Sequence, residues 1–196
     1  MTIGLFGGSF NPPHLAHLIV AETIRDRADL DEVWWVPART PPHKRDQGSR
    51  ELVAAEHRLA MTERAVASNP AFTVETLELD REGPSYTADT LRIVQERRPE
   101  DRFRLIIGSD SLAGLPDWHR PDAIADRVQL RVYPRPVVDL SGVPDRFREA
   151  ATFADVPLLE ISGTAIREDL AAGRSVRYLV PEAVRAYIER HALYGG

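Results

Sequence analysis

The feature that most constrains the fold is an alternation of short apolar segments with longer helical stretches. The apolar segments are rich in Val, Ile, Leu and aromatic residues, which is typical of strands covered on both faces. The candidate strands are residues 2–6, 32–36, 72–77, 102–107, 129–132 and 156–159. Strands that alternate with helices predict a parallel sheet with helices packed on it.

Helices are predicted between the strands by apolar periodicity and by residues typical of helix ends. The first covers 17–27, and the second presents Leu52, Ala55, Leu59 and Val66 on one face. The third presents Leu91 and Val94 on one face and is capped by Ser85 or Thr87. The fourth covers 164–172 and ends at Gly173, and the last begins at Pro181 and directs Val184 and Ile188 into the core. We find no internal repeat or linker. The prediction is a single α/β domain over residues 1–196, with an open, mostly parallel, Rossmann-like sheet flanked by helices.

Composition excludes several classes of protein. The 196 residues, 43% of them hydrophobic, are enough to bury a core. No apolar run approaches the roughly 18 residues of a membrane span, and no signal peptide is visible. The absence of cysteine excludes disulfides, thiolate catalysis and cysteine-ligated zinc, and fits a cytoplasmic location. A net charge of -5 argues against nucleic-acid binding. A homo-oligomer stays open.

Four polar loops follow predicted strands, namely residues 7–17, 38–50, 108–120 and 161–167. In open parallel sheets, ligands bind beyond the carboxyl ends of the strands, where the strand order reverses. We therefore expect all four loops to meet at one edge of the sheet and to form the functional site there.

The first loop, GGSFNPPHLAH, has neither the dinucleotide-binding glycine pattern nor the lysine of a Walker A loop. Gly7 and Gly8 allow a ligand to approach the backbone closely, and the two prolines fix the start of the following helix. His14 and His17 then lie one turn apart at the helix N-terminus. Donor groups, possible positive charge and exposed amides together predict a phosphate site. The alternatives are two ordinary polar residues, or two ligands of a zinc site without a visible third.

Two further loops carry cationic side chains. In ISGTAIRE, residues 161–168, Thr164 and Arg167 are three apart and suit a phosphate. The alternative is a helix cap followed by a surface arginine. The loop 38–50 holds Lys44, the one lysine of the chain, next to His43. That loop is either part of a phosphate site or an ordinary solvated loop.

Six segments taken in order resemble one family. They are GGSFNPPHLAH, PPHK, PSYTADTL, IIGSDSL, DWHR and ISGTAIRE. The H-x-x-H and I-S-x-T-x-x-R patterns resemble the nucleotidyltransferase superfamily, and the six together resemble bacterial nicotinate-mononucleotide adenylyltransferases over nearly the whole chain. The chain departs from the family pattern at two positions. Residue 16 is alanine, where the family usually has glycine, and Gly163 stands at a position where the identity of a small residue varies. We interpret Ala16 as a tolerated variant.

The resemblance implies transfer of AMP from ATP to nicotinate mononucleotide, with release of pyrophosphate, as a step of NAD biosynthesis. It implies that His14 and His17 contact the ATP phosphates, that Thr164 and Arg167 hold the departing pyrophosphate, and that Lys44, with His43, bridges the two substrates. Mg²⁺ is expected to arrive with ATP, and no metal site in the protein is expected. The implied catalytic residues are His14, His17, Lys44 and Arg167.

The same resemblance divides the ligand contacts between the substrates. The implied ATP contacts are Gly7, Gly8, Ser9, Phe10, His14, His17, Gly108, Asp110, Ile161, Ser162, Thr164 and Arg167. The implied contacts to nicotinate mononucleotide are Asn11, His43, Lys44, Ser85, Tyr86, Thr87, Asp110 and Trp118. Trp118 either stacks on the pyridine ring or belongs to the core, and Asp110 either binds a ribose or caps the next turn. Backbone amides near 86–88 and after Trp118 are expected to bind the carboxylate.

Rival functions are judged on the same residues. A phosphopantetheine adenylyltransferase usually has threonine at the position of His14 and lacks the PSYTADTL segment. An oxidoreductase would need the missing glycine fingerprint. A nucleotide-binding module without catalysis would be expected to lose Arg167 or one histidine. Equal use of nicotinamide mononucleotide is the remaining alternative within the family.

Overall fold

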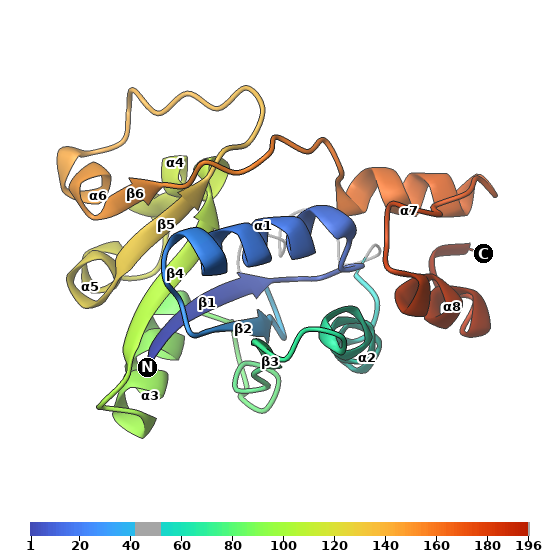
Figure 1. Cartoon of the computed structure of the whole chain (residues 1–196), viewed down its shortest axis with the longest axis horizontal. Helices are drawn as coiled ribbons and strands as arrows, with labels where there is room; N and C mark the ends of the chain where they lie inside the picture. The colour runs from blue at the N-terminus through green and yellow to red at the C-terminus, as the bar shows by residue number, and fades with distance from the viewer. Residues whose placement is uncertain (42–51, 196) are drawn as a thin grey trace.

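The computed structural model describes residues 1–41 and 52–195. Its centre is one six-stranded sheet in the order β3-β2-β1-β4-β5-β6, and every pair of neighbouring strands is parallel (Figure 1). The strands are β1 (Thr2–Gly8), β2 (Glu32–Pro37), β3 (Phe72–Val74), β4 (Arg102–Gly108), β5 (Gln129–Tyr133) and β6 (Ala151–Phe153). The prediction of an open parallel sheet is confirmed.

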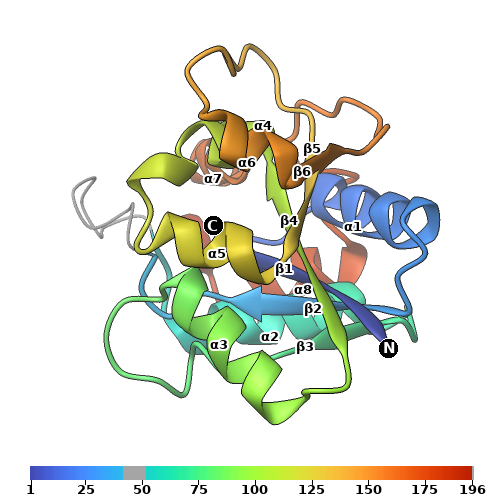
Figure 2. The ribbon, with the colours of Figure 1, turned by 90° about the vertical axis from the view of Figure 1, so that its left-hand side faces the viewer.

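Helices cover both faces of this sheet. They are α1 (Leu15–Arg27), α2 (Ala55–Val66), α3 (Thr87–Arg97), α4 (Ser109–Ala113), α5 (Pro121–Arg127), α6 (Asp145–Glu149), α7 (Gly163–Ala171) and α8 (Glu182–Arg190). Short 3₁₀ helices span Leu115–Asp117 and Leu193–Gly195. Figure 2 shows α1 on one side of the sheet and α3 and α5 on the other. In the described part of the chain, no helix has both the length and the apolar character needed to cross a membrane.

Successive residues of each central strand enter two separate cores. On β1, Ile3 and Leu5 pack with α3, α4, α5 and α6, whereas Phe6 packs with α1, α2, α7 and α8. All three side chains are at most 2% exposed. This double burial is the reason that the strands read as nearly continuous apolar runs.

The strand order reverses between β1 and β4. From β1 the chain moves outward to β2 and β3, then returns to place β4 on the other side of β1. Loops that leave β1 and β4 therefore diverge at the carboxyl edge of the sheet and open a crevice there. In Figure 1, α7 and α8 lie beyond this same edge.

The predicted sixth strand was wrong. Residues 156–159 form no regular element, and the edge strand is Ala151–Phe153, which pairs with Leu130–Val132 of β5. Val156 is buried, but Pro157 has no amide hydrogen to donate to a neighbouring strand, and Leu158 is 57% exposed. The apolar run packs as an irregular segment against α1 and the core.

Two helix predictions also need correction. The buried face of α2 comprises Arg58, Met61, Thr62, Ala65 and Val66, so only Val66 of the predicted face is buried. Helix α3 begins after Tyr86, whose side chain makes no capping bond, so neither Ser85 nor Thr87 is the cap. The predictions for Gly173, which has a positive φ of 68°, and for the buried Val184 and Ile188 are confirmed.

Candidate active site

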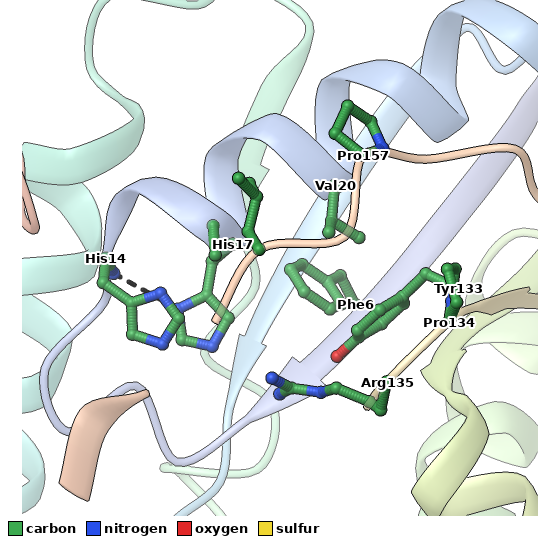
Figure 3. Close-up of a pocket in the computed structure, with 10 residues that line it drawn as sticks. Phe6, His14, His17, Val20, Tyr133, Pro134, Arg135 and Pro157 are labelled. Atoms are coloured by element: carbon green, nitrogen blue, oxygen red, sulfur yellow. Dashed lines mark hydrogen bonds between the residues drawn. The ribbon is translucent and has the colours of Figure 1, made fainter. Parts of the chain in front are cut away.

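His14 and His17 form a stacked pair at the start of α1. His14 is the residue before the first helical turn, and the two imidazole centroids lie 3.6 Å apart with the planes 19° from parallel. The backbone N–H of His14 donates to Nδ1 of His17 over 3.2 Å, as the dashed line in Figure 3 shows. Since Nδ1 accepts, the proton of a neutral His17 ring is on Nε2, which is then a donor.

Both imidazoles are neutral at pH 7. Burial, followed by the charge of Arg135, lowers the pKa of His14 to about 3. Burial, His14 and Arg135 hold the pKa of His17 well below its usual range. The pair therefore supplies hydrogen-bond donors rather than the positive charge considered from the sequence. Within the described residues, the buried Nδ1 of His14 has no hydrogen-bond partner, which suits a ligand atom at this place.

A cavity of about 340 Å³ opens beside the histidine pair, and we call it the donor cavity. Most residues predicted to contact ATP line it, namely Gly7, Gly8, Ser9, Phe10, His14, His17, Asp110, Ser162, Thr164 and Arg167. Two do not: Gly108 lines the neighbouring cavity, and Ile161 packs against the core on the α1 face. Asn11, predicted for the other substrate, lines the donor cavity.

The N-terminus of α7 docks on the loop after β1. Arg167 donates from Nη1 to the carbonyl of Asn11 over 3.1 Å and from Nη2 to the Thr164 hydroxyl over 3.4 Å. A Cβ on Gly163 would lie 3.1 Å from the same Asn11 carbonyl, so the close approach favours glycine. The helix cap is Ser162, whose hydroxyl accepts from the Ala165 amide, and Thr164 is left to face the cavity.

A second cavity of about 490 Å³ lies on the other side of the loop after β1, and we call it the acceptor cavity. Ser85, Tyr86, Thr87 and Trp118, four of the residues expected to contact nicotinate mononucleotide, line it, and Trp118 also packs against the core beneath α3. Gly7, Gly8, Ser9, Ser111 and Tyr133 belong to the walls of both cavities. Two substrates placed in the cavities would thus meet at Gly7 and Gly8, which are the last two residues of β1 and not the turn expected from the sequence. His43 and Lys44 lie outside the described residues.

Asp110 belongs to the donor cavity, in the first turn of α4. The residue before α4 is Gly108, so Asp110 is not the cap of that helix. Its Oδ1 lies 4.0 Å from Nε of Arg135. A Cβ on Gly108 would come within 2.2 Å of the same carboxylate oxygen, so this glycine makes room for Asp110.

Sequence reasoning missed several residues that line or support the site, among them Arg135, Tyr133, Glu78 and Arg58. Arg135 follows β5 by two residues, and Figure 3 shows its guanidinium reaching toward the imidazoles. Tyr133 ends β5 under that guanidinium, with 5.4 Å between the Tyr133 ring centroid and Cζ of Arg135. Both lie at the carboxyl end of a predicted strand, and this position could have identified them from the sequence as candidate site residues. Glu78 in the acceptor wall and Arg58 beneath both loops carried no such signal.

Comparison with known proteins identifies the family to which the chain belongs. The model of the cytidylyltransferase-like family matches residues 5–169. A Salinibacter ruber protein named probable nicotinate-nucleotide adenylyltransferase is 58% identical over 99% of this chain and 98% of its own. The chain belongs to the nicotinate-nucleotide adenylyltransferase branch of the cytidylyltransferase-like family.

Other members of that family support the assignment. The Bacillus subtilis nicotinate-nucleotide adenylyltransferase is 39% identical over 98% of this chain and 97% of its own. The solved structure of Plasmodium falciparum nicotinic acid mononucleotide adenylyltransferase complexed with NaAD has a TM-score of 0.81 and 21% identity, covering 98% of this chain and 97% of that one. At that identity the likeness establishes the fold.

Proposed function

We propose that this protein is a nicotinate-nucleotide adenylyltransferase, which transfers AMP from ATP to nicotinate mononucleotide and releases pyrophosphate, in NAD biosynthesis. One observation carries the proposal: the donor and acceptor cavities share the backbone of Gly7, Gly8 and Ser9 as a common wall. An ATP held by the histidine pair then presents its α-phosphorus to a mononucleotide phosphate in the acceptor cavity.

The reaction needs alignment more than proton transfer. A phosphate monoester already carries a nucleophilic oxygen at pH 7, so no general base is required. Catalysis then comes from in-line placement and from stabilising charge on the triphosphate. In the donor cavity, Nε2–H of His17 donates a hydrogen bond, and Arg135 and Arg167 supply the positive charge.

Mg²⁺ and the loop 38–50 complete the proposal. We expect Mg²⁺ to enter bound to ATP, and the carboxylate of Asp110 lies in the wall of the donor cavity to meet it. Lys44 and His43 are proposed to bridge the substrate phosphates, on the family resemblance alone. A cytoplasmic location likewise stays a prediction from the sequence, and the oligomeric state stays open.

Preference for the acid over the amide follows from the start of α3. Thr87 opens this helix and lines the acceptor cavity. The first amides of a helix have no partner within it, and the helix dipole favours a negative charge there. A carboxylate accepts from every such donor, whereas a carboxamide turns its NH₂ toward one of them. An unpaired buried donor costs about 1–3 kcal/mol, about ten- to a hundredfold in affinity.

A pyrophosphate-release assay tests the function directly. ATP is offered with nicotinate mononucleotide, nicotinamide mononucleotide or phosphopantetheine, each as the sole acceptor. We expect kcat/KM for the acid to be at least about tenfold that for the amide, and no turnover with phosphopantetheine. Equal efficiency with acid and amide would leave a dual-specificity adenylyltransferase, and turnover with phosphopantetheine alone would refute the proposal.

A further inference from the structure

Arg58 is a buried guanidinium that binds only backbone carbonyls in the described part of the chain. Its side chain is 1% exposed on the inner face of α2. Nε donates to the carbonyl of Val53 over 3.1 Å, and Nη1 donates to Ser9 over 3.0 Å and to Ala38 over 2.6 Å. Nη2 donates to the carbonyl of Arg39 over 3.1 Å.

These carbonyls belong to the loop after β1 and to the two ends of the connection between β2 and α2. Ser9 lies in the loop after β1, in the common wall of the donor and acceptor cavities. Ala38 and Arg39 directly follow β2, and Ala38 lines the acceptor cavity. Val53 precedes α2, and its own N–H donates to Oδ1 of Asn11 in the donor wall over 3.3 Å. One side chain thus joins the backbone of both cavities.

The segment Ala38–Thr40 is also held from the opposite side. The amides of Arg39 and Thr40 donate to the Ser85 hydroxyl over 3.0 and 3.4 Å, and the Ser85 amide donates to the Thr40 carbonyl over 3.1 Å. Arg58 therefore fixes the carbonyls of Ala38 and Arg39, while Ser85 fixes the amides of Arg39 and Thr40 and the Thr40 carbonyl. The remaining amide, that of Ala38, donates to the carbonyl of Gly8 at the end of β1 over 2.9 Å. A segment bonded on both sides has little freedom to shift relative to the loop after β1.

A contribution to stability alone does not explain why an arginine is buried at this position. A buried cation that makes no hydrogen bond to a carboxylate carries a desolvation cost, and burial lowers the pKa of Arg58 although Tyr194 and Glu56 act in the opposite direction. A planar guanidinium with five donors is, however, suited to join carbonyls that diverge from separate loops. A lysine has one nitrogen and can reach fewer of these carbonyls.

We propose that Arg58 is a positioning residue for adenylyl transfer, which sets the distance between the loop after β1 and the segment Ala38–Thr40 and so aligns the donor with the acceptor. This inference rests on the proposed function. It predicts that loss of the guanidinium impairs turnover even where the protein stays folded, because small misplacements of reacting groups cost about 100-fold in rate.

The test compares Arg58→Lys with Met61→Ala. Met61 is fully buried on the same helix and makes no bond to either loop, so its truncation lowers stability without acting on the cavities. Both variants are assayed well below their melting temperatures with ATP and nicotinate mononucleotide. We expect kcat to fall by about 10- to 100-fold in Arg58→Lys and to stay within about twofold of wild type in Met61→Ala, at similar losses of melting temperature.

Two measurements make the outcome decisive. In a double-mutant cycle, Arg58→Lys and Ser85→Ala should be non-additive in kcat, because both release the segment Ala38–Thr40. Amide hydrogen exchange should accelerate at Arg39 and Thr40 in Arg58→Lys but not in Met61→Ala.

A kcat near wild type in Arg58→Lys, or unchanged exchange in that segment, would overturn the inference. If the wild type itself turns over no substrate, the proposed function fails, and the exchange experiment still decides whether Arg58 holds the segment.

Discussion

At the scale of the residue, the protonation state of His17 decides what it can do. Its Nδ1 accepts from the His14 amide and its ring is neutral, so Nε2–H is the donor that the ring has left for a ligand. The ring is held edge-on by Phe10, with centroids 5.3 Å apart, and by Phe6 at 5.9 Å. His17 is therefore a donor fixed before the substrate arrives, which is the condition under which a hydrogen bond accelerates a reaction.

His17→Ala should lower kcat by about 10²- to 10³-fold, the usual effect of removing one preorganised donor. Because the ring also packs in the core, some stability will be lost as well. Ile24→Ala is the matched control, since Ile24 is 1% exposed on the same helix and lines neither cavity. Steady-state kinetics on both variants check this, and a His17→Ala enzyme within threefold of wild type would contradict it.

Ala16 is a second residue whose environment permits a sharp prediction. It lies inside α1, is 5% exposed, and lines a narrow pocket with Tyr133, Arg135 and Pro157, drawn in Figure 3. We expect Ala16→Gly to leave the KM for ATP unchanged or slightly lower, at a cost of about 0.5–1 kcal/mol in unfolding free energy.

Ala16→Val, by contrast, adds two methyl groups in this pocket and should raise the KM for ATP. Initial-rate measurements at varied ATP, with unfolding curves for both variants, decide the point. A normal KM in Ala16→Val would show that ATP does not approach this face of α1.

At the scale of the element, the start of α3 and the turn around Trp118 form the acceptor cavity. Tyr86 stacks on His119 with ring centroids 4.2 Å apart, which ties the two elements together at the cavity rim. Trp118 is half-buried between the cavity and the core, so one face of its ring is held by packing. Such a ring is a rigid platform for an aromatic base.

Trp118→Ala should raise the KM for nicotinate mononucleotide much more than the KM for ATP, because the ring lines the acceptor cavity and not the donor cavity. Varying each substrate at saturation of the other measures the two constants separately. Leu115→Ala, a fully buried change next to it, controls for local loosening of the turn. Equal increases in both KM values would place Trp118 in the core alone.

At the scale of the whole molecule, the buried histidines make stability depend on pH. An unfolded histidine binds a proton below a pH of about 6.5, whereas His14 in the folded protein does so only near its pKa of about 3. Between these values the unfolded state binds more protons, so stability rises with pH there. The contribution is present above pH 6.5 and is lost as the pH falls. Glu78 acts in the opposite sense, because burial raises its pKa.

His14→Gln should therefore flatten the dependence of the unfolding free energy on pH between about 5 and 6.5, by up to about 1.4 kcal/mol per pH unit. Glu78→Gln should make the same dependence steeper. Urea unfolding at a series of pH values measures both slopes. A His14→Gln slope equal to that of wild type would mean that His14 binds its proton equally in the folded and unfolded states.

Much of the fold and part of the site could be predicted from local patterns. The four interior strands were located correctly because both of their faces are buried, and the apolar runs that result are visible without knowledge of their partners. The edge strand predicted at 72–77 begins at the correct residue but ends at Val74. The histidine pair and the ISGTAIRE segment were predicted as phosphate sites because helix starts and residue spacing are local properties. The sixth strand was missed because Thr152 and Phe153 are exposed, so that Ala151–Phe153 carries a weaker apolar signal than the run after it.

The sequence by itself determined the order of the interior strands and of the five helices it predicted, and it identified candidate phosphate-binding side chains, since these follow from periodicity and from chemistry within one segment. Only the tertiary structure decided the charge of the histidines, because burial and the distant Arg135 set their pKa values. It also decided the contacts of Arg58, whose partners Ser9 and Ala38 are 49 and 20 residues away. Contacts of that range depend on how the elements pack, and no local pattern encodes them.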